Sequence, residues 1–347
     1  MTNVIQELAY LHGEPQTFAT LKAQPEHFFV SEKLSFNPSG SGEHFLVRIR
    51  KKGENTKYVA NELAKACGVT SRDVSWAGLK DRHAITEQWF SVHLAGKSDP
   101  DLTEFVASHE GIEAVLDTAR HNQKLRPGDL IGNDFSLVVT DIQGDKQDIE
   151  ARLNAIKQQG VPNYFGNQRF GNEGNNLVEA RKWGEKKYRL KDRSQRSFYL
   201  SAARAHLFNL VLSARIEHSL LAPMLGDLLI DTKDKLQLVT DLAAAALQLE
   251  QGFQVSGPMT GDNELPTSLQ AQEFEQNIVN AEPFLLAIIR DNRMQHERRA
   301  LIVYPDALQF AWEGANLRIN FGLPAGAFAT ALMREVIKEQ PSAHIDK

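Results

Sequence analysis

The chain has a single cysteine among its 347 residues and contains no long apolar run. Cys67 alone cannot form an internal disulfide, which excludes a small disulfide-stapled scaffold, and its apolar surroundings predict a buried thiol in a reducing compartment. The segment Met1–Tyr10 lacks a basic residue followed by an apolar stretch, as a signal peptide would have. No apolar run reaches the roughly 18 residues that a membrane span needs. We therefore expect a soluble, cytoplasmic protein with no membrane association.

The common cofactor and metal motifs are also missing from the sequence. There is no Gly-x-x-x-x-Gly-Lys-Ser/Thr loop and no Gly-x-Gly-x-x-Gly, and the glycines of Gly166–Gly171 are wrongly spaced for either. The histidines are scattered, without a His-Glu-x-x-His pair, paired cysteines or clustered aspartates. We expect a reaction that needs no cofactor and no metal.

The composition is that of a globular protein, but its charge is unevenly distributed. Hydrophobic residues make up 42% and charged residues 24%, and the net charge is −5. Residues 181–196 carry eight basic and two acidic side chains, whereas residues 227–276 carry nine acidic and two basic ones. Trp183 and Tyr188 within the basic stretch favour RNA binding, because stacking and phosphate neutralisation act together on RNA. The alternative for this stretch is a solvated surface loop.

Periodicity predicts strands at both ends of the chain and a helical middle. A helix is expected after the cap Asn55, ending at Gly68, and another over Ser201–Arg215 capped by Ser201. Further helices are expected over Asp148–Gln159 and Ala327–Lys338. The predicted strands are His44–Arg50, Asp73–Ala77, Glu87–Leu94, Phe135–Ile142, Ala300–Tyr304 and Leu308–Phe321, the last with a turn at Glu313–Asn316. This arrangement indicates one domain inserted into another.

The densest cluster of reactive side chains is Trp76–Gln88, which includes Lys80, Asp81 and His83. The segment Gly78–Thr86 is predicted to be a loop between two strands. Taken alone, this segment is also compatible with a charged surface turn in which Asp81 pairs with Lys80 or Arg82.

The same segment resembles the Gly-x-Lys-Asp-x-x-Ala-x-Thr-x-Gln signature of the TruD family of tRNA pseudouridine synthases. Four more segments resemble motifs of that family in the same order: Leu21–Glu32, Gly132–Phe135, Pro162–Gly171 and Leu323–Thr330. His27 stands where the family usually has Asp, and Leu79 where glutamine is common, which puts a polar helper at that position in doubt.

The resemblance implies isomerisation of uridine 13 of tRNA to pseudouridine. Asp81 is the implied catalytic residue, because a carboxylate can trap the positive charge that develops on the ribose or remove a proton from it. Either Lys80 or Lys22 would hold Asp81 as the anion and neutralise phosphate. The choice between attack at C1′ and proton removal at C2′ stays open.

A uracil that leaves the base stack needs apolar faces and an amide that reads its edge. Phe28, Phe135 and Phe328 are candidates for the faces and Asn133 for the amide, within the motifs that the family would use for its substrate. Phe28, Asn133 and Phe328 are the positions expected to touch the substrate. Phe135 follows Asn133 by two residues and would share its side of a strand, so its alternative role is to support the wall of the pocket. Outside the motif context, these phenylalanines would be ordinary core residues.

The fold implied by the family is α+β. A pseudouridine synthase catalytic domain with a mixed, largely antiparallel sheet is expected over residues 1–158 and 305–347, and an inserted, family-specific α/β domain over 159–304. The expected partner is tRNA, with no obligate protein partner. Two other functions remain open: a catalytically silent RNA-binding or RNA-chaperone protein, and a nucleoside glycosidase that uses Glu87 as a second carboxylate.

Overall fold

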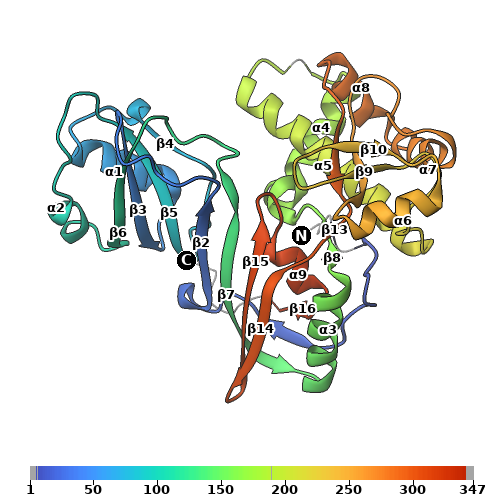
Figure 1. The fold of residues 1–347 in the computed structure, drawn as a ribbon, viewed down its shortest axis with the longest axis horizontal. Helices are drawn as coiled ribbons and strands as arrows, with labels where there is room; N and C mark the ends of the chain where they lie inside the picture. The colour runs from blue at the N-terminus through green and yellow to red at the C-terminus, as the bar shows by residue number, and fades with distance from the viewer. Residues whose placement is uncertain (1–4, 6, 189, 341–347) are drawn as a thin grey trace. The chain divides into compact units, whose positions relative to one another are not determined.

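The computed structural model describes residues 5, 7–188 and 190–340, and they form two compact units (Figure 1). Unit 1 comprises residues 1–15, 151–304 and 327–336, and unit 2 comprises residues 16–150, 305–326 and 337–347. The segment 159–304 lies entirely within unit 1. Its role as an inserted domain, beside a catalytic domain of residues 1–158 and 305–347, stays a prediction.

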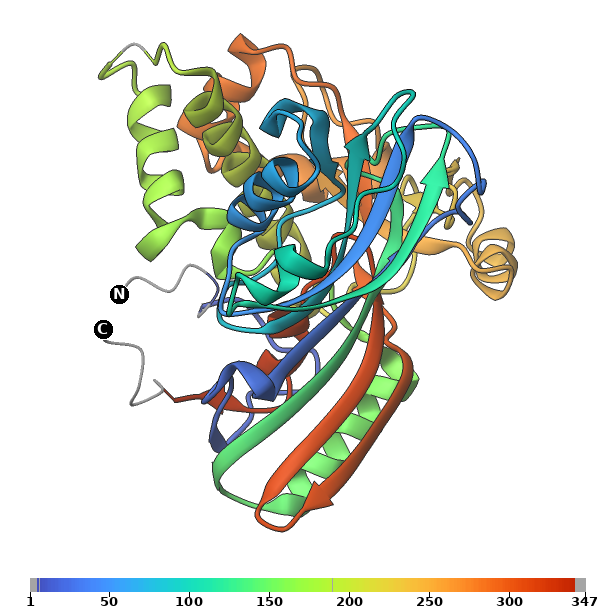
Figure 2. The same ribbon diagram turned by 90° about the vertical axis from the view of Figure 1, so that its left-hand side faces the viewer.

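Unit 2 is built on a ten-stranded sheet in which strands from both ends of the chain are neighbours (Figures 1 and 2). The strand order is β14-β15-β7-β2-β5-β3-β6. Outside this order, β1 pairs with β7 and with β16, and β4 pairs with β5. Only the β2–β5 and β1–β16 pairs are parallel. The predicted α+β fold with a mixed, largely antiparallel sheet is confirmed. The strands are β1 (Phe18–Thr20), β2 (Phe28–Leu34), β3 (His44–Lys52), β4 (Val74–Trp76), β5 (Ile85–His93), β6 (Ile112–His121), β7 (Leu130–Gln143), β14 (Asp306–Glu313), β15 (Asn316–Pro324) and β16 (Lys338–Glu339).

Helix α1 (Thr56–Ala66) covers one face of this sheet. The alternating positions Phe45, Val47 and Ile49 of β3 are buried against Val59 and Leu63 of α1. Asn55 caps the helix by accepting a hydrogen bond from the Tyr58 amide, and Gly68 has the positive φ of 61° expected after a helix end. Both ends of this helix were predicted. Cys67, at its C-cap, is buried as expected, and burial raises the pKa of its thiol to about 11.

The other predicted strands of unit 2 are confirmed with small shifts in their ends. The short helices are α2 (Thr103–Ala107) and two 3-10 turns, Pro25–His27 and Ser71–Asp73. Helix α3 (Lys146–Gln159) begins in unit 2, where the Trp312 indole donates to Glu150 Oε1 at 2.7 Å, and the boundary between the units falls within it.

Unit 1 is mostly helical and has its own core. A four-stranded antiparallel sheet, in the order β10-β9-β11-β12, packs against the long helix α5, and β8 pairs with β13. Its elements are β8 (Val161–Pro162), α4 (Asn175–Gly184), α5 (Arg193–Glu217), β9 (Leu228–Ile230), β10 (Leu236–Leu238), α6 (Leu242–Glu250), β11 (Gln254–Met259), α7 (Leu269–Asn280), α8 (Pro283–Asp291), β12 (Glu297–Ala300), β13 (Ile302–Val303), α9 (Ala329–Arg334) and the 3-10 turns Asn167–Phe170 and Asn172–Gly174.

Two predicted helix boundaries are wrong. Helix α5 does not begin at Ser201: it begins at Arg193, because the Asp192 carboxylate accepts the Gln195 amide at 2.9 Å and caps it. The last helix does not run to Lys338. It ends at Arg334, and Lys338–Glu339 instead pairs with Phe18–Ala19 as strand β16.

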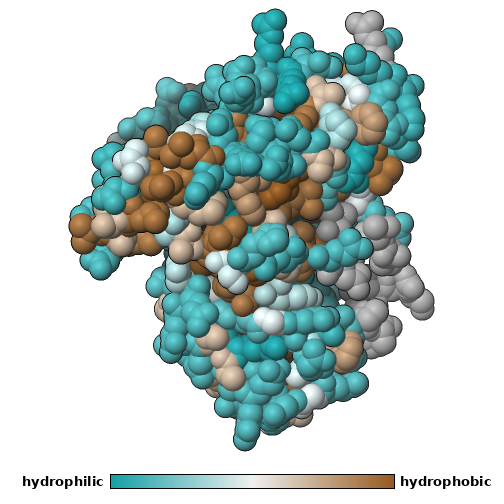
Figure 3. All heavy atoms as spheres, turned by 90° about the vertical axis from the view of Figure 1, so that its right-hand side faces the viewer, coloured by the Kyte–Doolittle hydropathy of each residue, from teal (hydrophilic) through white to brown (hydrophobic). Residues whose placement is uncertain are grey.

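The surface of unit 1 carries exposed apolar side chains on helix α6. Leu242, Leu247 and Leu249 are all exposed, and apolar residues gather on the face of the molecule shown in Figure 3. No helix within the described residues is both long and apolar enough to cross a membrane.

Candidate active site

The loop between β4 and β5 carries Asp81, and buried polar side chains hold its backbone. The Gln88 side chain donates to the Gly78 carbonyl at 2.6 Å. The Thr56 hydroxyl accepts the Lys80 amide at 3.0 Å and donates to Gln88 Oε1 at 2.9 Å. Gln88 and Thr56 are both buried, so these bonds form away from competing water. Together they fix the loop on the α1 side of the sheet.

Lys51 anchors the backbone of Asp81 itself. Its ammonium, fully buried, donates to the Asp81 carbonyl at 3.2 Å and to the Glu54 carbonyl at 2.7 Å. Burial lowers the pKa of Lys51 to about 8, and the charge of Asp81 opposes this shift. A buried cation is therefore used to hold the main chain next to the candidate carboxylate.

The Asp81 carboxylate forms an ion pair with Lys22, one of the two lysines that the sequence proposed. The Asp81 side chain remains 30% exposed and that of Lys22 17% exposed. Lys22 has a positive φ of 56°, uncommon for a residue with a side chain, and its ammonium lies 4.0 Å from the centroid of the Phe28 ring. The strained backbone thus presents a cation to a carboxylate that solvent can reach. The surface turn in which Asp81 pairs with Lys80 or Arg82 is not what the structure shows.

Lys80 has different partners. Its ammonium lies 2.9 Å from Glu32 Oε1 and donates to Asn133 Oδ1 at 2.9 Å. The Glu32 side chain is fully buried, and burial raises its pKa while the adjacent Lys80 opposes the shift. Lysine has no acceptor, so the amide oxygen of Asn133 must face Lys80 and its two N–H donors are left for another group.

Asn133 and Phe135 lie on one side of β7, as predicted from their spacing. In the register with β2, Asn133 is opposite Glu32 and Phe135 is opposite Val30. Phe28 and Phe135 meet edge to face with ring centroids 6.3 Å apart, and Phe135 stacks on Phe321 at 5.3 Å. Phe28 and Phe135 are 5% and 9% exposed. These rings form a packed aromatic wall of unit 2 rather than an open platform.

Phe328 belongs to unit 1, where it precedes the first residue of α9. It is half-buried, and its ring centroid lies 6.1 Å from that of Phe165 in the core of that unit. A role at the substrate stays a prediction for this residue.

Glu87, the second carboxylate that a glycosidase would need, lies on the opposite face of the sheet from Gln88. Its carboxylate is held by Arg48 at 2.6 Å and Arg50 at 2.7 Å and also accepts from Ser31. Because side chains alternate along β5, Glu87 and the Gln88 that supports the Asp81 loop point to different sides. The structure does not bring Glu87 together with Asp81.

Much of the basic stretch 181–196 is already paired within unit 1. Arg181 forms an ion pair with Glu282 at 2.5 Å, Lys182 pairs with Glu179 at 2.7 Å, and Lys187 pairs with Glu185. Arg189 lies outside the described residues.

The two aromatic residues of the stretch also have internal contacts. Trp183 packs against the core of unit 1, and the Tyr188 hydroxyl donates to Glu179. Lys186 and Arg193 are exposed and stay candidates for phosphate.

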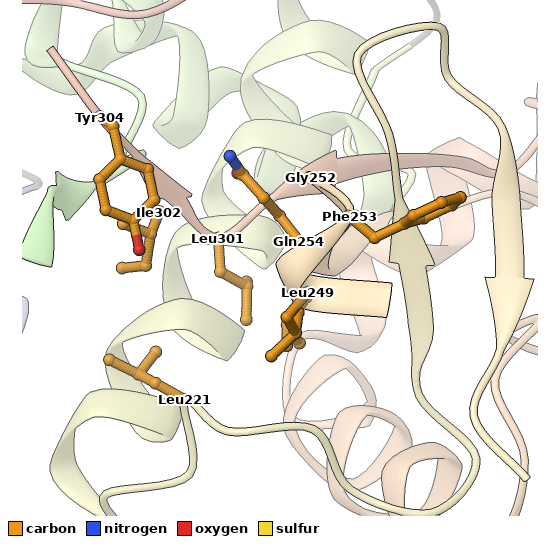
Figure 4. Close-up of a pocket in the computed structure, with 9 residues that line it drawn as sticks. Leu221, Leu249, Gly252, Phe253, Gln254, Leu301, Ile302 and Tyr304 are labelled. Carbon is orange, nitrogen blue, oxygen red and sulfur yellow. The ribbon is translucent and has the colours of Figure 1, made fainter. Parts of the chain in front are cut away.

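A cavity of about 350 Å³ in unit 1 is lined mostly by apolar residues (Figure 4). Leu221, Leu249, Leu301 and Ile302 contribute side chains, and Gln254 and Tyr304 are its polar members. None of the lining residues is a carboxylate, so this cavity lacks the group that the predicted chemistry requires. Within the described residues, no group of three or more His, Cys, Asp or Glu side chains could hold a metal ion.

The sequence identified Asp81, Lys22, Lys80 and Asn133 as site residues but missed the residues that support them. Gln88 could have been found, since it is the last position of the quoted signature. Glu32 could also have been found, since it is the last residue of the motif segment Leu21–Glu32. Thr56 and Lys51 gave no local signal, because their partners depend on the pairing of strands distant in sequence.

The paired Asp81 carboxylate, on a clamped loop between the neighbouring strands β4 and β5 of a mixed sheet, is the arrangement of the class of enzymes that act through a carboxylate. Comparison of the sequence with known proteins identifies the family within this class. The family described as tRNA pseudouridine synthase D (TruD) matches residues 5–183 and 175–336. The chain belongs to the TruD family.

The similarity extends over whole chains. Proteins called tRNA pseudouridine synthase D from Photobacterium profundum and Vibrio vulnificus are 52% and 53% identical, over 100% and 98% of both chains. A crystal structure from Methanosarcina mazei, of a protein assigned to TruD, has a TM-score of 0.73 at 22% identity and covers 96% of each chain. That structure supports the fold.

Proposed function

We propose that this protein isomerises uridine 13 of tRNA to pseudouridine, acting in the cytoplasm on its tRNA substrate. The observation that carries the proposal is the Asp81–Lys22 ion pair on a loop whose backbone is held by Thr56, Gln88 and Lys51. Relatives of about 50% identity along the full chain are called tRNA pseudouridine synthase D.

Asp81 acts on the ribose of the target uridine. Breaking the N1–C1′ bond leaves the bonding electrons on uracil and positive charge on the sugar, which an ionised carboxylate stabilises or traps. Attack at C1′ and removal of the C2′ proton both fit a carboxylate at this position. After uracil turns, C5 bonds to C1′ and displaces the carboxylate where that has bonded to C1′. The C5 proton passes to solvent and N1 takes up a proton, so the product is an isomer of the substrate. Lys22, which pairs with the Asp81 carboxylate, places positive charge near the RNA phosphates.

Asn133 reads the uracil. Because Lys80 occupies its amide oxygen, Asn133 offers N–H donors, which complement the carbonyl oxygens of uracil and not the amino group of cytosine. Phe28 and Phe135 form the wall beside this amide, and Phe328 supplies a further aromatic contact to the base. The reaction as proposed uses no cofactor and no metal.

A silent RNA-binding protein would need neither the Asp81–Lys22 pair nor the polar clamp on its loop. A nucleoside glycosidase would need a second carboxylate, and Glu87 is held by two arginines on the other face. Both alternatives are therefore less well supported than isomerisation.

The test is Asp81→Asn, assayed by pseudouridine mapping and by single-turnover rates on tRNA. We expect the rate to fall by more than about 10³-fold with tRNA affinity within a few-fold of wild type, because a lost nucleophile or base has no substitute. Asp134→Asn is the matched control: this carboxylate pairs with Lys33 at 2.6 Å and is half exposed, and its loss should leave the rate unchanged. Activity of Asp81→Asn above a tenth of wild type would refute the assignment, as would mapping that finds no product at position 13.

A further inference from the structure

Helix α5 presents a row of polar and basic side chains along one face at its N-terminal end. Arg193, Ser197, Ser201 and Arg204 follow one another at intervals of four, four and three residues, and Arg196 comes three residues after Arg193, so the five share a side of the helix. All five line one cavity of about 310 Å³, which belongs entirely to unit 1. This volume is at the lower end of the range for small-molecule sites and suits a ligand the size of one nucleotide.

The three arginines that line this cavity differ in the contacts that they make within the protein. Arg204 is buried and donates to the carbonyls of Met259, Thr260 and Gln295, with Glu297 3.4 Å away. Its guanidinium is therefore occupied by hydrogen bonds within unit 1.

The other two arginines lie nearer the surface. Arg196 donates to the Leu190 carbonyl at 3.0 Å, and its Nε is buried without a hydrogen-bond partner in the structure. Arg193 is exposed. A further guanidinium approaches from Arg169, which donates to Ser201 Oγ at 3.1 Å. The guanidinium groups of Arg193 and Arg196 thus line this cavity, with Arg169 beside it, and phosphate matches the planar guanidinium fork.

The remaining walls are apolar. Leu200 of α5, Met259 and Met294 line the rest of the cavity. Methionine sulfur is polarizable and makes favourable contacts with aromatic rings, so this wall can hold the face of a base. Two serine hydroxyls, of Ser197 and Ser201, supply hydrogen bonds to a sugar or a base edge.

We propose that this cavity binds one nucleotide of the tRNA substrate, with its phosphate on Arg193 and Arg196 and its base against Met259 and Met294. The proposal rests on the proposed function for the identity of the RNA. It adds a contact at a site distinct from Asp81, one that contributes affinity and not chemistry.

Three variants test the site. Arg193→Ala removes an exposed cation, and tRNA binding should weaken about 5-fold near 0.1 M salt while the slope of log affinity against log salt falls by close to 0.7. Arg193→Lys should restore most of that slope. Ser197→Trp fills the cavity from an exposed position of the helix and should cost about 10-fold in affinity, the order expected for one lost base contact.

The matched control is Arg290→Ala, an exposed arginine at the end of α8 that does not line the cavity. All variants should keep the wild-type thermal midpoint and the wild-type single-turnover rate at saturating tRNA. The proposal is overturned if Arg193→Ala and Ser197→Trp bind tRNA as tightly as Arg290→Ala does. It is also overturned if they lose binding of free uridine or adenosine monophosphate while tRNA affinity is unchanged.

These results are separable from a failure of the proposed function. The wild-type protein's product on tRNA tests the function, whereas the affinity difference between the Arg193 and Arg290 variants tests the cavity. The binding measurements can be repeated in the Asp81→Asn background, where no product forms.

Discussion

Around Asp81, each ionisable side chain has a partner of its own. Lys22 pairs with the Asp81 carboxylate, Lys51 holds the Asp81 carbonyl, and Lys80 pairs with Glu32. Glu54 also acts electrostatically on Lys51, and Glu339 interacts with Lys22. The positive charges of the three lysines are therefore matched by carboxylates within unit 2.

Lys80→Met should show how much more the buried Lys80–Glu32 pair contributes to the free energy of unfolding than an exposed ion pair does. It leaves Glu32 buried without its cation, and a broken buried pair costs about 3–5 kcal/mol. Lys33→Met is the control, because Lys33 and Asp134 are 38% and 50% exposed and such pairs contribute less than about 1 kcal/mol. Urea unfolding of both variants measures the difference, and equal stabilities would contradict the pairing described here.

The double variant Lys80→Met/Glu32→Gln extends this comparison to function. It should recover most of the lost stability, since no buried charge remains, but it should not recover the rate, since Asn133 still lacks the group that orients its amide. A double variant that regains full activity would remove Lys80 from the proposed recognition of uracil.

Glu335 should make stability depend on pH. Its side chain is fully buried, and burial raises its pKa from 4.5 to about 7, so the folded state holds a proton that the unfolded state has lost between these values. Stability should therefore fall by up to about 3 kcal/mol as pH rises from 4.5 to 7. Glu335→Gln should abolish this contribution, making the variant more stable than wild type near pH 7.5 and equal to it near pH 4. Urea unfolding across this range is the measurement, and parallel curves for the two proteins would contradict the prediction.

For single helices, the ends could be predicted where neighbouring residues determine them, and not where residues distant in the sequence do. Helix α1 was predicted at both ends because Asn55 and Gly68 carry local signals. The predicted start of helix α5 was too late, because its first turn, Arg193–Arg196, is polar and shows no apolar periodicity. The C-terminal helix was drawn too long, because only the distant Phe18–Ala19 strand determines that Lys338 is extended.

The same distinction holds for the site. Asp81 and Asn133 lie in recognisable motifs, and their neighbours along the chain could be read directly. Lys51 reaches the Asp81 carbonyl only because β3 and β5 pair with Lys51 opposite Thr86, and this register has no signature in either strand. Glu32 becomes a buried partner of Lys80 for the same reason.

Strand β7 packs closely against its neighbour β15 at Gly132. A Cβ at Gly132, next to Asn133, would lie 2.3 Å from the Leu323 carbonyl oxygen of β15. Gly132→Ala should therefore destabilise the protein by about 1–3 kcal/mol and slow the reaction by displacing Asn133. Gly78→Ala is the control for stability, since a Cβ there meets nothing within 4 Å. Chemical denaturation of both variants measures their free energies of unfolding. A Gly132→Ala protein as stable as wild type would show that β15 can move away from the added methyl group.

For the whole molecule, the two charged stretches of the sequence are partly neutralised by folding. In the acidic stretch, Asp227 and Glu275 are buried in ion pairs with Arg215 and Arg298. In the basic stretch, Arg181 and Lys182 pair with nearby glutamates. The surface field is therefore weaker than the sequence indicates, and long-range attraction of RNA rests on fewer cations.

Replacing Lys186, Lys187 and Arg189 together by alanine should still weaken tRNA binding and lower its salt dependence by about one to two units of log–log slope. The lower value is expected if Lys187 stays with Glu185. Binding isotherms at several salt concentrations measure this, with Lys233→Ala/Lys235→Ala in the acidic stretch as control. The rate at saturating tRNA should barely change, and an unaltered slope would make the basic stretch a solvated loop.

Each compact unit is assembled from three separate stretches of the chain. On the ribosome, β7 emerges long before β15, its partner in the sheet, and the core of unit 1 lacks Ala331 until α9 has been made. Neither unit can complete its core during most of translation, so the growing polypeptide carries unpaired strand edges that invite aggregation until release. A premature stop codon before α9 would consequently damage both units at once, instead of leaving one of them intact.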